Sequence, residues 1–130
     1  MNKIFRQSME VGYYFKNEVN DDRTDDWYGS EECATFTKII LDYAKENGCD
    51  ISFAFYEIMD ETIEKIHNED ICVEEHMGDD YYKGFVAGEI LGFPTKENLR
   101  KVGKAEKLWK DANSYGYYQE VLYDILEECR

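Results

Sequence analysis

The sequence predicts an all-α fold, a compact bundle of five or six helices in a single domain over residues 1–130. Three observations support this prediction. Apolar residues recur every three or four positions along most of the chain, which is the period of an α-helix. Proline occurs only once, so little interrupts a helix. Gly84, Gly88 and Gly92 recur every four residues, so a helix over about 80–92 would carry them in one row at the centre of the bundle.

This glycine row needs another helix packed against it. An interior glycine costs about 1 kcal/mol of helix stability relative to alanine, so two of them require a compensating gain from close packing. Small residues at this spacing are best known from membrane helices, but Lys83 and Glu89 interrupt the segment. Its apolar run is also far shorter than the roughly 20 residues that span a bilayer. Self-association of two copies through Gly84 and Gly88 is the alternative use of the row.

Two helices are predicted before the middle of the chain. The first keeps a helical period to about Glu18. The second begins after Ser30, a good N-cap whose first turn is acidic, where the helix dipole favours negative charge. It ends at Asn47 and Gly48, a typical C-terminal stop. The apolar face of the second helix consists of Cys33, Phe36, Ile39, Ile40, Tyr43 and Ala44.

A third helix is predicted over about 51–67, with Asp50 as its N-cap. Residues 51–55 would look like a strand if taken alone, but the apolar residues up to Ile66 fall on one side of a helix. Phe53 is the exception and lies near the opposite, acidic side. That side carries Glu57, Asp60, Glu61 and Glu64.

The second half of the chain continues the helical pattern. Gly92 should stop the glycine-row helix, and Thr95 should cap the next helix, which extends to about residue 112. A last helix follows over about 118–129, and polar segments at 20–29 and 68–78 connect the helices. The helix after Thr95 is basic on one arc, which consists of Lys96, Arg100, Lys104, Lys107 and Lys110.

The four cysteines lie far apart and form no Cys-x-x-Cys pair. The N-terminal residues contain no apolar stretch of the length that a secretory signal has. We therefore expect reduced thiols in a cytoplasmic protein.

The charge is both large and unevenly distributed. The formal net charge is −14, which repels nucleic acid and anionic membranes and attracts basic partners. Residues 17–32 hold seven acidic side chains and one basic, and residues 57–80 hold ten and one. Residues 96–110 hold six basic side chains and two acidic. The basic helix could instead neutralise the protein's own acidic surface.

The histidines do not complete a metal site. Glu64 and His67 have the Glu-x-x-His spacing of di-iron bundles, but such sites need that motif twice, and Val73 stands three residues before His76. A zinc site from His67, Cys72 and His76 would have an unusual spacing and no assigned fourth ligand.

Two acidic segments suggest other metals. Asp21 to Glu32 has the length of an EF-hand calcium loop, but Arg23 and Asp26 stand where that loop requires a ligand and a glycine. The carboxylates of the third helix could bind magnesium in an all-helical nucleotide pyrophosphatase. That family carries paired acidic motifs on two helices, and only one such row is present here. We therefore expect no catalytic residues, metal or cofactor, with a metal-dependent hydrolase as the alternative.

The remaining signal is the concentration of acidic side chains in particular segments, which predicts a binding surface for a basic protein. The carboxylates of the third helix recur about every 5 Å along its axis, of the same order as the roughly 3.4 Å between charges on one DNA strand. Aromatic anchors could come from Trp27, Tyr28, Phe53 and the tyrosine pairs Tyr13-Tyr14, Tyr81-Tyr82 and Tyr117-Tyr118. In size and charge the chain resembles small phage or mobile-element inhibitors of restriction or CRISPR machinery. We expect no direct contact with nucleic acid or membrane. Besides the third-helix carboxylates, the predicted partner-binding residues are Asp21, Asp22, Asp25, Asp26, Trp27 and Tyr28.

Overall fold

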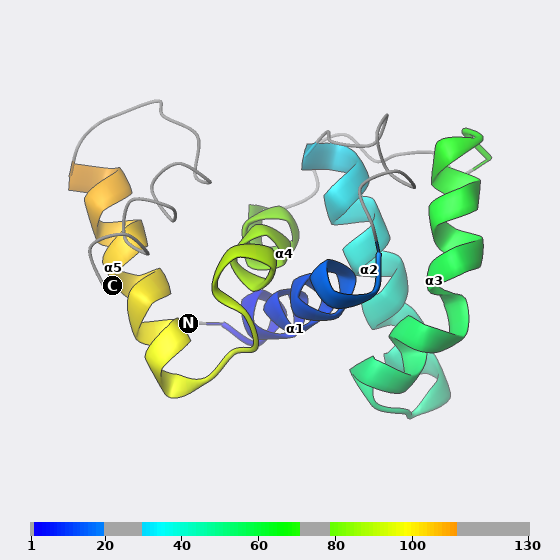
Figure 1. The fold of residues 1–130 in the computed structure, drawn as a ribbon, viewed down its shortest axis with the longest axis horizontal. Coiled ribbons are helices and arrows are strands. Elements are labelled where there is room, and N and C mark those ends of the chain that lie inside the picture. The colour runs from blue at the N-terminus through cyan, green and yellow to red at the C-terminus, as the bar shows by residue number, and fades with distance from the viewer. Residues whose placement is uncertain (1, 20–29, 71–78, 112–130) are drawn as a thin grey trace.

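The computed structural model describes residues 2–19, 30–70 and 79–111, and these ranges contain five helices and no strand. The predicted all-α class is therefore confirmed for this part of the chain (Figure 1). The predicted helix near the C-terminus and most of both polar connections lie outside the described residues. The helices are α1 (Lys3–Glu18), α2 (Ser30–Asn47), α3 (Ile51–His67), α4 (Asp79–Leu91) and α5 (Lys96–Asp111).

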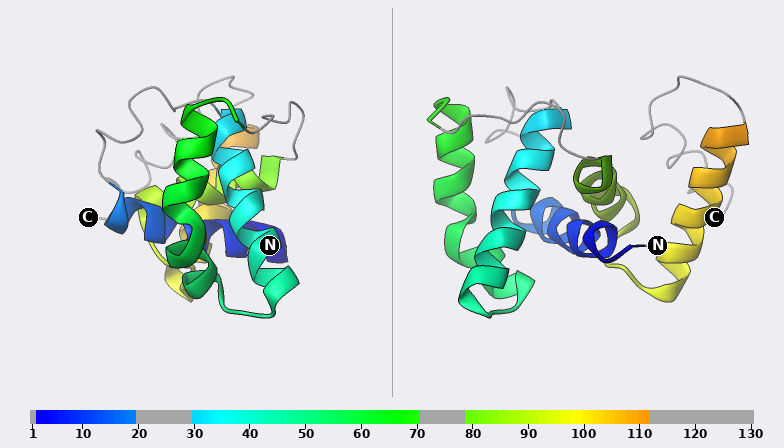
Figure 2. Two further views of the ribbon diagram at one scale, coloured as in Figure 1. Left: turned by 90° about the vertical axis from the view of Figure 1, so that its right-hand side faces the viewer. Right: turned by 180° about the vertical axis from the view of Figure 1, so that it is seen from behind.

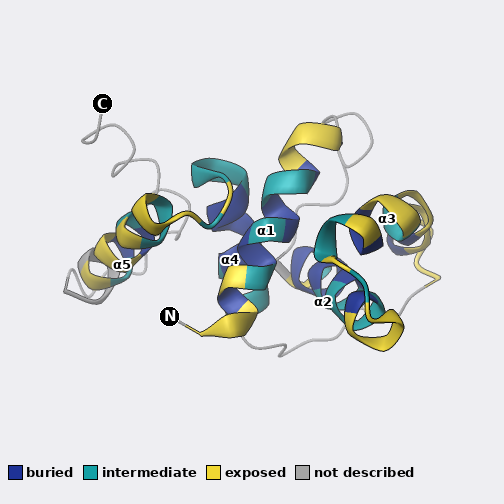
Figure 3. Cartoon of the chain, turned by 90° about the horizontal axis from the view of Figure 1, so that it is seen from below, coloured by how far each residue is buried: buried dark blue, intermediate teal, exposed yellow. Residues whose placement is uncertain are grey.

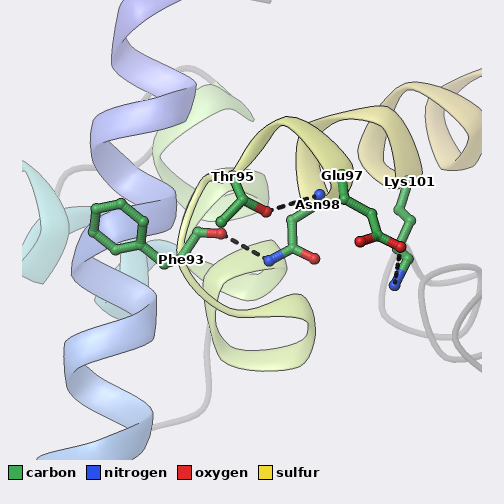
Figure 4. Close-up of polar contacts among 5 residues, drawn as sticks. All are labelled: Phe93, Thr95, Glu97, Asn98 and Lys101. Atoms are coloured by element: carbon green, nitrogen blue, oxygen red, sulfur yellow. Dashed lines mark hydrogen bonds and ion pairs between the residues drawn. The ribbon is translucent and has the colours of Figure 1, made fainter.

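The helix boundaries follow the signals in the sequence. Residues 51–67 form one helix, as predicted, and no strand. Gly48 and Gly92 end α2 and α4 with φ angles of +60° and +104°, a backbone conformation that favours glycine. The Thr95 hydroxyl accepts a hydrogen bond from the Asn98 N–H at 3.2 Å, which confirms Thr95 as a cap (Figure 4). Asp50 occupies the N-cap position of α3, but its side chain makes no capping hydrogen bond.

The glycine row of α4 packs directly against α1. A Cβ atom on Gly84 would lie 2.6 Å from the Ser8 Cβ and 2.7 Å from the carbonyl oxygen of Phe5. A Cβ atom on Gly88 or on Gly12 would overlap a carbonyl oxygen of the opposite helix. The expected covering helix is thus α1, which contributes a glycine of its own. Because α1 covers the row, Gly84 and Gly88 are buried and are not exposed for the alternative use, self-association of two copies.

The expectation that the bundle is centred on α4 is not confirmed. It is α1 that contacts α2, α3 and α4, whereas α4 contacts α1 and α2. The helices α2 and α3 run side by side in both views of Figure 2. α5 lies at the opposite end of the long axis from α3 (Figure 1) and joins the rest through Val102 and Ala105, which are buried with Phe5, Met9, Val86 and Ala87.

The centre of the core is a cluster of four phenylalanines, one from each of the first four helices. The ring centroids of Phe15 and Phe85 lie 5.0 Å apart, and those of Phe15 and Phe36 lie 5.4 Å apart. Phe36 also contacts Phe55 at 6.1 Å. All of these pairs are edge-on, the arrangement that the ring quadrupoles favour. The cluster ties α1, α2, α3 and α4 together.

The two described cysteines are free thiols in different environments. Cys33 is buried, and burial together with the Glu89 and Glu32 carboxylates raises its pKa to about 12. Cys49 is only partly buried. Because the thiolate is the reactive form, we expect N-ethylmaleimide at pH 8 to label Cys49 at least about tenfold faster than Cys33. Peptide mass spectrometry of timed samples measures both rates. In urea the two rates should converge, and equal rates in the folded protein would contradict the burial of Cys33.

Candidate functional site

The predicted carboxylate row lies on the solvent side of α3. Ala54, Phe55, Thr62, Ile63 and Ile66 form the buried side of this helix, which packs on α2. The acidic residues fall on the other side, because their spacing places them away from those apolar positions. Glu57, Asp60, Glu61 and Glu64 are all exposed, as predicted (Figure 3, yellow).

Two aromatic side chains are exposed beside these carboxylates. Phe53 is 57% exposed and Tyr56 is 49% exposed. Each precedes an acidic residue by one helical turn, Phe53 before Glu57 and Tyr56 before Asp60, so ring and carboxylate are surface neighbours. The expected position of Phe53 near the acidic side is confirmed. We name this surface the acidic face and define it as Phe53, Tyr56, Glu57, Asp60, Glu61 and Glu64.

One carboxylate of the acidic face pairs with a lysine of the same helix. The Lys65 ammonium lies 2.7 Å from a Glu61 carboxylate oxygen, but both side chains are largely exposed to solvent. An exposed pair of this kind contributes about 0.3–0.5 kcal/mol to helix stability. The basic residues of α5 do not neutralise the face, because α3 and α5 lie at opposite ends of the molecule (Figure 1). The four whose side chains the structure describes are exposed: Lys96, Arg100, Lys104 and Lys107.

The rest of the predicted binding surface is not described. Asp21, Asp22, Asp25, Asp26, Trp27 and Tyr28 lie outside the described residues, as does most of the segment compared with a calcium loop. The structure therefore brings together only the α3 part of the predicted site.

A row of aromatic rings crosses α1 and reaches the acidic face. The ring centroids of Phe93 and Tyr13 lie 5.7 Å apart, those of Tyr13 and Tyr14 lie 5.5 Å apart, and those of Tyr14 and Tyr56 lie 6.0 Å apart. Figure 4 shows the Phe93 ring directed from the α4–α5 connection toward α1. We name these four residues the aromatic belt. Only the adjacent Tyr13 and Tyr14 could be noticed as a pair in the sequence.

Two carboxylates anchor the tyrosine hydroxyls of the belt. The Tyr14 hydroxyl donates to a Glu10 carboxylate oxygen at 2.7 Å, and the Tyr56 hydroxyl donates to a Glu18 carboxylate oxygen at 3.0 Å. Burial raises the pKa of both phenols, and the hydrogen bond to the carboxylate and its negative charge raise each pKa further. Both hydroxyls therefore stay protonated at neutral pH and keep donating.

A pocket of 390 Å³ opens elsewhere on the surface, between α1, α2, the first residue of α3 and the start of α4. Its lining includes Lys3, Lys45, Cys49 and Tyr81, and no residue of the acidic face or the belt. The described residues contain no group of three histidine, cysteine, aspartate or glutamate side chains placed to hold a metal ion. Cys72 and His76, which the sequence offered as zinc ligands, fall in an undescribed range.

No helix in the described part of the chain is both long enough and apolar enough to cross a membrane. Comparisons with protein-family models, with curated proteins and with solved structures find no match.

Proposed function

We propose that this chain is a non-enzymatic binding protein that modulates a basic, nucleic-acid-handling protein by covering its cationic surface. The observation that supports the proposal most is the composition of the acidic face. Four carboxylates and two exposed aromatic side chains share one side of α3, far from the basic residues of α5.

Charge and shape both favour a basic partner. The net charge of −14 steers a cationic surface toward the protein, and a charged rim raises the association rate. The carboxylates of α3 recur about every 5 Å along the helix axis, the same order as the roughly 3.4 Å phosphate spacing of a nucleic-acid strand. A channel that binds phosphates could therefore accept this helix. Inhibitors of restriction or CRISPR machinery from phages or mobile elements act on partners of this kind.

Exposed aromatic residues add the contacts that charge alone does not provide. Interfaces obtain most of their binding energy from a few buried anchors, among which aromatic side chains are enriched. Phe53 is more than half exposed, so its ring gains burial only when a partner covers it. We propose Phe53 as the apolar anchor of the interface, surrounded by carboxylates that select a basic surface.

Charge reversal on α3 tests this function. We expect the combined change of Glu57, Asp60, Glu61 and Glu64 to lysine to abolish a salt-sensitive complex with the partner captured from the source cell. The four side chains are exposed, so the circular dichroism spectrum should stay helical. The partner, identified by mass spectrometry and purified, should lose nucleic-acid binding when wild-type chain is added and keep it when the variant is added.

A matched pair of variants separates the location of the charge from its amount. One variant combines Glu57→Lys with Glu64→Lys on the acidic face. The other combines Glu31→Lys with Glu46→Lys at exposed positions of α2, and it changes the net charge by the same amount. We expect only the first pair to weaken the complex strongly. Equal weakening by both pairs would show that net charge alone drives binding, and unchanged affinity would exclude the acidic face.

A further inference from the structure

We propose that the aromatic belt receives an arginine side chain of the basic partner at Tyr56, beside the Glu18 carboxylate. This inference rests on the proposed function, since it names the group that the partner places beside the acidic face. The two surfaces are continuous, because Tyr56 belongs to both.

The rings of the belt form an open row at the surface. Its two ends are well exposed, with Phe93 at 41% and Tyr56 at 49% exposure. Tyr13 and Tyr14 between them are half-buried. Tyr14 also contacts the core ring of Phe55, with centroids 5.7 Å apart, so the row rests on a rigid base. A planar cation can stack on such rings within about 6 Å of a ring centroid.

The carboxylates beside the rings are held in place but not neutralised. Glu10 and Glu18 each accept one hydrogen bond from a neutral tyrosine hydroxyl. Arg6 and Lys16 are the basic residues of α1 nearest in sequence, and among the described residues neither forms an ion pair with these carboxylates. A carboxylate offers about four lone-pair positions, so each can accept further hydrogen bonds from a ligand.

This combination of groups suits arginine better than other partners. A guanidinium group can stack on a tyrosine face while donating two parallel hydrogen bonds to a carboxylate, whereas a lysine ammonium is a compact, strongly hydrated point charge. An apolar partner would bury Glu10 and Glu18 without supplying donors, which is costly. The belt therefore selects arginine among the side chains of a basic surface.

Two peptides test the proposal with the full chain. One is a ten-residue peptide containing three arginines, and the other carries lysine at the same three positions. We expect isothermal titration at low salt to give about fivefold tighter binding of the arginine peptide, the size of an exposed cation–π contact. Tyr56→Leu and Glu18→Gln should each abolish this preference, so that the two peptides bind about equally. Both variants should keep the helical circular dichroism spectrum. Glu46→Gln, an exposed change on α2, should leave the preference intact.

The outcomes separate this inference from the proposed function. Equal affinity for the two peptides, or an arginine preference that survives Tyr56→Leu, overturns the belt as an arginine site. If the charge reversal on α3 still abolishes the partner complex in that case, the proposed function stands alone. If the arginine preference is present but the α3 reversal leaves the partner complex unchanged, the proposed function fails and the arginine site stands.

Discussion

Replacing Gly88 by alanine should lower the free energy of unfolding by about 2–3 kcal/mol, although alanine is the better helix former. The added Cβ would overlap the carbonyl oxygen of Met9 and lie 2.8 Å from the backbone nitrogen of Tyr13. Both atoms belong to the backbone of α1, so no side chain can move aside to make room. The two helices must separate, and the packing along the whole crossing is weakened. Urea unfolding followed by circular dichroism measures the loss.

Gly103 provides the matched control for this substitution. It lies inside α5, and a Cβ atom there would meet nothing within 4 Å. Gly103→Ala should therefore raise the stability of the helix by about 1 kcal/mol, which is the intrinsic preference for alanine. If Gly88→Ala is also stabilising, α1 and α4 do not approach as closely as the structure shows.

Replacing Phe36 by alanine should cost about 3–5 kcal/mol, a large part of the stability of a domain of this size. Its side chain is fully buried, at 0% exposure, and contacts phenylalanines of three other helices. Removing the ring leaves a cavity that the neighbouring rings of α1, α3 and α4 cannot all fill. The same urea titration measures this loss.

Phe53 offers the same substitution at a surface position. Because its ring is 57% exposed, Phe53→Ala should change the free energy of unfolding by no more than about 0.5 kcal/mol. If Phe53 is an interface anchor, this variant should instead weaken the partner complex by at least about tenfold. A large loss of stability would contradict the exposed position of the ring. Normal stability with unchanged affinity would remove Phe53 from the proposed interface.

Local sequence signals predicted the helices well because they depend on neighbouring residues. Residues 51–55 look like a strand when taken alone. The apolar residues between 51 and 67, however, repeat with a helical period along one side, and the whole segment forms one helix. Glycines after α2 and α4 marked the ends because a positive φ is costly for other residues. The same periodicity placed Glu57, Asp60, Glu61 and Glu64 on the solvent side, so this part of the candidate site was predictable.

Tertiary structure decided which surfaces meet, because hydrophobic burial is not directional and a periodic pattern does not name its partner. The glycine row required a covering helix, but only the fold shows that this helix is α1, with Gly12 facing α4. The aromatic belt joins residues from α1, α3 and the connection before α5, which no local pattern relates. The separation of the acidic α3 from the basic α5 likewise follows from where the core places each helix, and it leaves the acidic face open to a partner.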